Sequence, residues 1–340
     1  MNYSAPWWLP GGNLQTIWAS LRGQRYLNAS PLFRRERWTT PDQDFVDVDW
    51  LMDNSSDDTK TRPLLVVFHG LEGSSSSHYA EAFADVSRTL GWACAVPHFR
   101  GCSGELNLAP RAYHSGDFAE IDWMLRRFKT MHAGPLLAVG ISLGGNALMR
   151  WAGEIENAAA DVVSAITSVC SPLDLTASGK AIGAGFNRQT YTRMFLGTMV
   201  PKALQKLGQH PHLFSREALL AARDLYAFDD IFTAPLHGFK DTEDYWRRAS
   251  AKPHMRRIAV PALALNTLND PFVPAVSLPT AGDVSTQVTL WQPGQGGHVG
   301  FPVKSAAGWP HAHVRAMPMA VCEFLAQHLP SSTRRSEIHG

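Results

Sequence analysis

The sequence predicts an α/β fold with a mostly parallel central sheet, helices on both faces of that sheet and a helical cap inserted late in the chain. Three observations lead to this prediction. From residue 64 onward, short apolar segments rich in β-branched residues alternate with segments of helical periodicity. A Gly-x-Ser-x-Gly motif lies between one such strand and the helix after it. The alternation stops over residues 172–254 and then resumes, which indicates an insertion within one core.

The composition is that of a globular protein. Apolar residues make up 45% of the 340 residues and charged residues 18%, which argues against disorder. The net charge of +1 gives no reason to expect binding to nucleic acid or to an acidic membrane surface. The four cysteines have no zinc-site spacing, and we expect buried free thiols.

No targeting or membrane segment is expected from the sequence. The first eight residues lack the basic start and continuous apolar core of a signal peptide. The purely apolar runs are far shorter than the ~20 residues that a membrane span needs. These features predict a cytoplasmic protein without an integral membrane segment.

The N-terminal part of the chain is predicted to form one short helix and an antiparallel pair of strands. Prolines and glycines delay the helix to about Asn13. Residues 36–52 read as two strands joined by a turn at 40–42. In the second strand Asp47 and Asp49 alternate with apolar neighbours, which predicts one buried face and one wet face.

The other elements follow from periodicity and composition. Strands are expected at 64–68, 92–96, 136–139, 162–169, 259–265 and 287–291. Core helices are expected at 78–90, 117–131, 147–151 and 311–328, and cap helices at 190–199, 201–207, 215–222 and 242–250. Residues 1–171 and 255–330 would then form the core, 172–254 the cap, and 331–340 a frayed polar tail.

Ser142 is the candidate nucleophile, at the centre of the Gly-x-Ser-x-Gly motif. A strand, a sharp turn and a helix are the context that this motif requires. Gly140 and Gly144 have no Cβ atom, so they permit the strained turn that holds the serine. The serine oxygen would then lie free at the carboxyl end of the strand.

A nucleophilic serine needs a histidine base and a carboxylate that orients the base. Asp270 and His298 each follow a later strand, in the chain order acid and then base. We favour Asp270 over Asp283, which looks like an exposed turn residue. We favour His298 over His311 and His313, predicted at the start of the last helix, because two glycines let its loop bend back over the sheet.

The oxyanion formed by serine attack needs two preorganised donors. The backbone N–H of Leu143 directly follows the nucleophile. The second donor should come from the loop after the first parallel strand, where we assign the N–H of Leu71. His69 would buttress this loop, and the serines at 74–77 read as polar residues that cap a helix.

No metal or other cofactor is expected. The His, Cys and carboxylate residues show no zinc-site spacing. The nearest candidate, residues 237–241, reads as a loop turn.

The motifs together resemble the YheT-like branch of the α/β-hydrolases, whose relatives include ABHD lipases and yeast medium-chain ester synthases. The resemblance covers most of the chain. It depends on PWWLPGGNLQT at 6–16, HGLEGS at 69–74, RGCSGE at 100–105, GISLGGN at 140–146, FDD at 228–230, NDPF at 269–272 and GHVGF at 297–301.

This resemblance implies carboxylic ester hydrolysis or acyl transfer, with Ser142, Asp270 and His298 as the catalytic triad. The expected substrate is a small ester or lipid-like molecule. Large apolar residues at 191–200 in the cap favour short to medium acyl chains. Three functions stay open: an esterase, an acyltransferase that uses an alcohol in place of water, and a ligand-binding protein that keeps the fold. The oligomeric state is also open.

Overall fold

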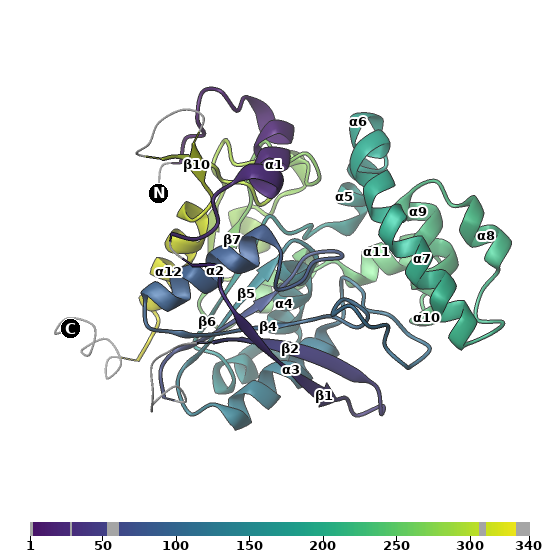
Figure 1. The fold of residues 1–340 in the computed structure, drawn as a ribbon, viewed down its shortest axis with the longest axis horizontal. Helices are drawn as coiled ribbons and strands as arrows, with labels where there is room; N and C mark the ends of the chain where they lie inside the picture. The colour runs from purple at the N-terminus through teal and green to yellow at the C-terminus, as the bar shows by residue number, and fades with distance from the viewer. Residues whose placement is uncertain (1–2, 28, 53–60, 306–310, 331–340) are drawn as a thin grey trace.

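The computed structural model describes residues 3–27, 29–52, 61–305 and 311–330. The predicted frayed tail at 331–340 lies outside these residues. The main sheet of the described chain has eight strands in the order β1-β2-β4-β3-β5-β6-β7-β8 (Figure 1). The strands are β1 (Phe33–Thr39), β2 (Phe45–Leu51), β3 (Leu64–Phe68), β4 (Ala93–Pro97), β5 (Leu136–Ile141), β6 (Ala165–Val169), β7 (Ala262–Leu265) and β8 (Val288–Trp291).

The predicted mostly parallel sheet is confirmed. The six strands β4-β3-β5-β6-β7-β8 pair in parallel with their neighbours. The strands β1 and β2 form an antiparallel hairpin, and β2 also pairs antiparallel with β4. The strand β5 lies between β3 and β6, near the middle of the sheet. Parallel strands end at one common edge, so the loops after β3, β5, β7 and β8 meet there.

Helices cover both faces of the sheet, as predicted. Leu65 and Val67 of β3 face the side covered by α2 and α12, and Leu64 and Val66 face the side covered by α3 and α4. This alternation of two buried faces explains why the strand is a continuous apolar run. The core helices are α1 (Gly11–Arg22), α2 (His78–Thr89), α3 (Phe118–Met131), α4 (Leu143–Ile155) and α12 (Ala316–Ala326).

The prediction that Asp47 and Asp49 lie on a wet face is wrong. Both residues are buried, at 2% and 4% exposure. Arg35 on the edge strand β1 pairs with Asp49 at 2.7 Å, and Arg37 pairs with Asp47 at 2.8 Å. The Asp49 carboxylate also contacts His98 at 2.9 Å. Polar and apolar residues therefore do alternate along β2, but the polar face of the strand is covered by side chains from the neighbouring strand and from a distant loop.

Carboxylates in and beside β2 that are paired in the folded state should make the stability of the protein sensitive to acid. Burial opposes ionisation of Asp42, but hydrogen bonds from Arg100 and Thr40 lower its pKa from 3.8 to about 2. The pKa values of Asp44 and Asp49 are likewise lowered by hydrogen bonds that outweigh burial. A carboxyl with a lowered pKa in the folded state stabilises the fold above its unfolded pKa, and this contribution is lost as the pH falls.

We therefore expect the free energy of unfolding to decrease as the pH falls from about 4 to 2, measured by urea titration at several pH values. Asp49→Asn should flatten this dependence, whereas replacement of the exposed Asp161 by Asn should not. A free energy of unfolding that is constant over this range would contradict the assignment.

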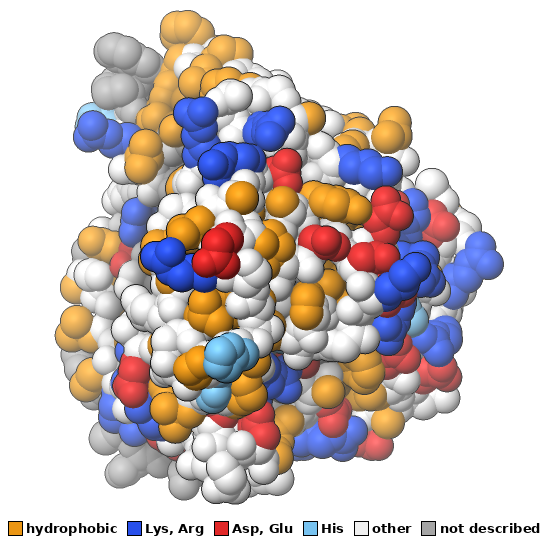
Figure 2. All heavy atoms as spheres, turned by 90° about the vertical axis from the view of Figure 1, so that its right-hand side faces the viewer, with side chains coloured by type: hydrophobic (Ala, Val, Ile, Leu, Met, Phe, Trp, Pro, Cys, Tyr) orange, Lys and Arg blue, Asp and Glu red, His pale blue; other side chains and the backbone are white. Residues whose placement is uncertain are grey.

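The segment between β6 and β7 is mostly helical, and we call residues 172–254 the cap. It lies beside the core at the right of Figure 1, and its outer face mixes basic, acidic and apolar side chains (Figure 2). Its helices are α5 (Leu175–Ile182), α6 (Gly185–Asn187), α7 (Arg193–Gln209), α8 (Arg216–Ala221), α9 (Leu225–Phe228), α10 (Ala234–Leu236) and α11 (Thr242–Ala249).

The predicted break between cap helices at 199 and 201 does not occur. The helix α7 continues through Pro201 to Gln209. A proline inside a helix removes one backbone hydrogen bond and crowds the preceding turn, at a cost of ~3 kcal/mol. The apolar side chains of Met199 and Ala203, before and after the proline, share one face of α7 that packs inward, so tertiary packing offsets this cost.

The last helix starts later than predicted. α12 begins at Ala316, so His311 and His313 are not at its start. Instead β10 (Ala312–His313) pairs with β9 (Val303–Lys304), and the neighbouring backbone bonds to Gln24. The backbone groups of this segment are thus satisfied by strand pairing, which helical periodicity alone could not indicate.

Within the described part of the chain, the helices are all too short or too polar to cross a membrane.

Candidate active site

Ser142 occupies the sharp turn between β5 and α4. Its backbone has φ 51° and ψ −117°, a strained conformation for a residue with a Cβ atom. The flanking glycines permit it. A Cβ atom on Gly140 would lie 2.4 Å from the Cα of Gly145, and one on Gly144 would lie 2.5 Å from the carbonyl oxygen of His69. The Gly-x-Ser-x-Gly spacing thus follows from close backbone approach on both sides of the serine.

The structure brings the three candidate triad residues together in one hydrogen-bonded row. The Nε2 atom of His298 lies 2.9 Å from Ser142 Oγ, and its Nδ1 atom lies 2.8 Å from Asp270 Oδ2. The second oxygen, Oδ1, accepts the backbone N–H groups of Phe272 and Val273 at 2.7 and 3.2 Å. These bonds fix the carboxylate, whose side chain is fully buried.

The alternative candidates lie elsewhere. Asp283 is in a short turn, where its carboxylate accepts the N–H and hydroxyl of Thr280. His313 belongs to β10, and His311 directly precedes that strand. None of the three forms a hydrogen bond to Ser142 or His298 within the described residues.

The N–H of Leu71 is available as a donor. In its loop, Gly70 N–H donates to the Tyr79 hydroxyl, Glu72 N–H donates to the Tyr113 hydroxyl, and Gly73 N–H donates to a loop carbonyl. Leu71 N–H has no acceptor within the described residues, and the same holds for Leu143 N–H at the start of α4. Both residues line the cavity into which Ser142 opens. Two free donors beside the serine are what an oxyanion would need.

His69 supports this loop from behind. It is fully buried, and its Nε2 atom accepts the Phe99 N–H at 3.0 Å while Nδ1 lies 2.7 Å from the Gly70 carbonyl oxygen. Burial is the main cause that lowers the pKa of His69 to about 3, so the ring stays neutral with its proton on Nδ1. This geometry is consistent with the predicted buttress, since both ring nitrogens of His69 are used in contacts with Gly70 and Phe99.

Sequence reasoning missed two positioning residues in α1. The hydroxyl of Thr16 accepts the backbone N–H of His298 at 2.8 Å. The buried amide of Gln15 accepts Asn269 Nδ2 at 3.0 Å and Gly296 N–H at 2.8 Å. The helix α1 therefore holds both the loop that contains Asp270 and the loop that contains His298. The motif at 6–16 was the available signal, but its spacing alone does not say what it contacts.

A largely apolar cavity opens at the serine. Its empty space is about 1160 Å³, the mouth to solvent included. The walls come from the loops of the sheet and from the cap, whose main apolar contributions are Leu175, Ile182, Phe195, Met199, Phe228 and Phe232. Of the two methionines at 191–200, only Met199 lines the cavity; Met194 is 57% exposed. This is the shape and polarity of a site for an apolar ligand.

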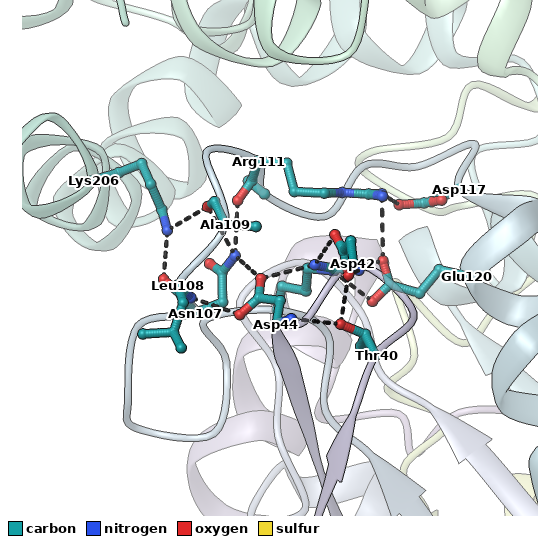
Figure 3. A network of polar contacts seen from close by, with 12 residues as sticks. Thr40, Asp42, Asp44, Asn107, Leu108, Ala109, Arg111, Asp117, Glu120 and Lys206 are labelled. Atoms are coloured by element: carbon teal, nitrogen blue, oxygen red, sulfur yellow. Dashed lines mark hydrogen bonds and ion pairs between the residues drawn. The ribbon is translucent and has the colours of Figure 1, made fainter. Parts of the chain in front are cut away.

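One wall of the cavity is the loop between β4 and α3, and a network of charged side chains holds it in place (Figure 3). Arg100, at the start of this loop, is 5% exposed and pairs with Asp42 and Asp44 at 2.8 Å each and with Glu120 at 3.0 Å. Three carboxylates around one guanidinium connect the β1–β2 turn, the loop and α3. The wall is therefore rigid at its base.

Groups of three or more His, Cys, Asp or Glu side chains placed to hold a metal ion do not occur among the described residues. His237 instead approaches the Ala112 carbonyl oxygen at 2.9 Å. The four cysteines are buried and free.

Comparison with known proteins adds independent evidence. Residues 63–305 match the family described as the alpha/beta hydrolase fold. The chain is 38% identical over 283 residues to “Putative esterase YheT” of Escherichia coli (strain K12), which covers 79% of this chain and 81% of that protein. It is 27% identical over 302 residues to human “Phospholipase ABHD3”, which covers 84% of this chain and 72% of that protein.

A solved structure supports the same fold. Est1E from Butyrivibrio proteoclasticus with bound ferulic acid superposes with a TM-score of 0.54 and 14% sequence identity, over 87% of this chain and 98% of that chain. At this identity the likeness concerns the fold alone.

Proposed function

The chain belongs to the alpha/beta hydrolase family, as the resemblance in its sequence predicts, and we propose that it hydrolyses carboxylic esters through an acyl-enzyme on Ser142. The observation that carries this proposal is the row Ser142–His298–Asp270 at the apolar cavity. The names of the relatives, an esterase and a phospholipase, favour the same reaction class.

In the first half-reaction Ser142 Oγ attacks the ester carbonyl carbon while its proton passes to His298 Nε2. Asp270 keeps the Nδ1 proton of His298 in place and stabilises the imidazolium that forms. The negative charge on the carbonyl oxygen would be received by the N–H groups of Leu71 and Leu143. Collapse of this intermediate breaks the bond to the alcohol oxygen, which takes the proton from His298.

In the second half-reaction a water molecule takes the part of the nucleophile and the same steps occur on the acyl-enzyme. His298 takes a proton from water as the water oxygen attacks the acyl carbon, and the proton returns to Ser142 Oγ as the acid leaves. An alcohol in place of water would give acyl transfer by the same steps, because both reactions share the acyl-enzyme.

A serine-directed phosphonate and a chromogenic ester test this proposal. We expect stoichiometric labelling of Ser142, found by peptide mass spectrometry, and turnover of 4-nitrophenyl butyrate that the label abolishes. Labelling without turnover would favour a binding protein. Turnover in the presence of ethanol that yields mainly the ethyl ester would favour an acyltransferase.

The cavity predicts a limit on acyl-chain length. Each buried methylene should contribute up to ~0.8 kcal/mol until the apolar wall ends. We therefore expect kcat/KM for 4-nitrophenyl esters to rise from acetyl to about hexanoyl or octanoyl and to fall for longer chains. A flat profile, or a strict preference for acetyl, would contradict an apolar acyl site.

Two methionines on α7 provide a matched pair for this test. Met199→Trp fills part of the cavity and should move the optimum to shorter chains, with acetyl hydrolysis little changed. Met194→Trp lies on the exposed side and should leave the profile as it is. An unchanged optimum in Met199→Trp would place the acyl chain elsewhere.

A further inference from the structure

The loop that carries the Leu71 N–H has a strained residue next to it. Glu72 has φ 57°, in the left-handed region that side chains with a Cβ atom rarely adopt. Such a conformation persists only when the surroundings hold it. The Tyr113 hydroxyl does so from two sides, since it accepts the Glu72 N–H at 2.9 Å and donates to Glu72 Oε1 at 3.0 Å.

Tyr113 is itself fixed by packing. Its ring stacks on Phe99, with centroids 5.4 Å apart and planes 8° apart. The backbone N–H of Phe99 donates to His69, which supports the same loop. Burial is the largest cause that raises the pKa of Tyr113 well above its ordinary value, so the hydroxyl keeps its proton. We call the two hydrogen bonds between the Tyr113 hydroxyl and Glu72 the clamp on Glu72. The Tyr113 ring therefore has a defined position, and its hydroxyl always has a proton to donate to the Glu72 carboxylate.

The cap reaches the same clamp. Lys202 of α7 places its Nζ atom 2.9 Å from Glu72 Oε2, whose side chain is only 10% exposed. One helical turn later, the buried Lys206 donates to the carbonyl oxygen of Ala109 at 2.9 Å (Figure 3). Lysines four residues apart lie on one face of a helix. The helix α7 is thus fastened to two loops of the core, and one of them carries Leu71.

We propose that Glu72 and Tyr113 are positioning residues for the oxyanion hole, and that Lys202 makes this positioning depend on the place of α7 over the cavity. The inference rests on the proposed function. The Leu71 N–H shares a peptide group with the Gly70 carbonyl oxygen, which is bonded by His69 Nδ1 and by the Gly73 N–H. The neighbouring peptide groups are held by the hydrogen bonds from Gly70 N–H to Tyr79 and from Glu72 N–H to Tyr113. The direction of the Leu71 N–H therefore depends in part on the ion pair between Lys202 of α7 and Glu72.

This role predicts a split between kcat and KM. An oxyanion donor binds charge that exists only in the transition state, so a misplaced donor lowers kcat and leaves KM almost unchanged. Loss of a whole donor costs ~10²–10³ in kcat. Tyr113→Phe should misplace one donor and lower kcat by ~10- to 100-fold, with KM within about twofold of the wild-type value.

A trifluoromethyl ketone gives the second readout. It adds to the serine oxygen and places an oxyanion where the intermediate would have one. Its Ki should rise in Tyr113→Phe by the same factor by which kcat/KM falls. A variant that merely altered packing of the cavity would change KM and Ki together and leave kcat alone.

The cap link is tested by a double-mutant cycle. Lys202→Met keeps the apolar stem of the side chain and removes the charge, and we expect kcat to fall about fivefold. Glu72→Gln retains an acceptor for Tyr113 and should have a similar effect. The double variant should show no further loss, because both changes break one interaction. Lys240→Met is the control for Lys202→Met, and Tyr226→Phe is the control for Tyr113→Phe. Both control residues belong to the cap and lie outside the residues that line the cavity.

The outcomes separate this inference from the proposed function. An unchanged kcat and Ki in Tyr113→Phe, with turnover that still requires Ser142, would overturn the inference alone. Additive losses in the cycle would overturn the link to the cap. If Ser142→Ala hydrolysed esters at the wild-type rate, both the proposed function and this inference would be overturned. If Tyr113→Phe fails to fold, the half-exposed Lys202 provides the same kcat and Ki comparison.

Discussion

The Ser142→Ala variant is expected to hydrolyse 4-nitrophenyl esters roughly a millionfold more slowly than the wild-type protein. The alanine has no oxygen that could attack the ester or give a proton to His298 Nε2, which lies 2.9 Å from the serine hydroxyl. Steady-state kinetics and phosphonate labelling measure this loss. The affinity for a non-hydrolysable ester analogue should stay near the wild-type value, because the cavity walls are unchanged.

The residues of the row should act as one unit. His298→Ala should lower kcat about as far as Ser142→Ala, and the double variant should lose nothing more. Ser76→Ala, an exposed serine in the run after the candidate oxyanion loop, is the control and should keep full activity. Activity near the wild-type level in Ser142→Ala would remove the nucleophile from the proposed mechanism.

The sequence was sufficient to predict the sheet and the sharp turn at Ser142 because both depend on local patterns. Apolar runs such as 64–68 are strands buried on both faces, as a parallel sheet between two helix layers requires. Gly140 and Gly144 signal the turn at Ser142 because a side chain at either position would overlap the backbone. Each signal is contained within a few neighbouring residues.

The errors concern residues whose surroundings come from distant parts of the chain. Asp47 and Asp49 look solvent-exposed until Arg35 and Arg37 are placed opposite them. Pro201 reads as a helix break until the inward face of α7 is packed. Polar periodicity and helix propensity state what a segment prefers in isolation, and tertiary partners override that preference.

The residues that position the site could not be predicted from the sequence for the same reason. The spacing of the motif at 6–16 does not indicate that Gln15 and Thr16 bind the loops of Asp270 and His298, more than 250 residues later. Tyr113 carries no motif that links it to Glu72. Hydrogen bonds between such distant segments depend on the topology of the sheet, which must be known first.

Replacement of Asp270 by asparagine should lower kcat by ~10⁴-fold with little change in structure. Asparagine has nearly the same shape, but only one of its two terminal atoms accepts a hydrogen bond. The position of Oδ1 is set by the N–H groups of Phe272 and Val273, so the amide oxygen must occupy it. The NH₂ group is then directed at His298 Nδ1.

This orientation puts the proton of His298 on the wrong nitrogen. Because the amide donates, Nδ1 must accept, and the neutral ring then carries its proton on Nε2. An Nε2 atom that carries a proton cannot take one from Ser142, which lies 2.9 Å away. The expected loss therefore comes from the tautomer, while the row of hydrogen bonds stays intact. A pH–rate profile and a crystal structure of Asp270→Asn would measure both parts of this expectation.

Asp270→Ala separates the two contributions of the carboxylate. The alanine leaves His298 free to adopt either tautomer, so its activity should equal or exceed that of Asp270→Asn, although the ring is less well oriented. Asp283→Asn is the control and should keep wild-type kcat, since the Asp283 carboxylate accepts hydrogen bonds from Thr280 in its own turn and lies 3.9 Å from Lys252 Nζ, away from His298. If Asp283→Asn lost activity and Asp270→Asn kept it, Asp270 would not be the acid. If Asp270→Ala were far less active than Asp270→Asn, orientation of the ring rather than control of its tautomer would be the main contribution of Asp270.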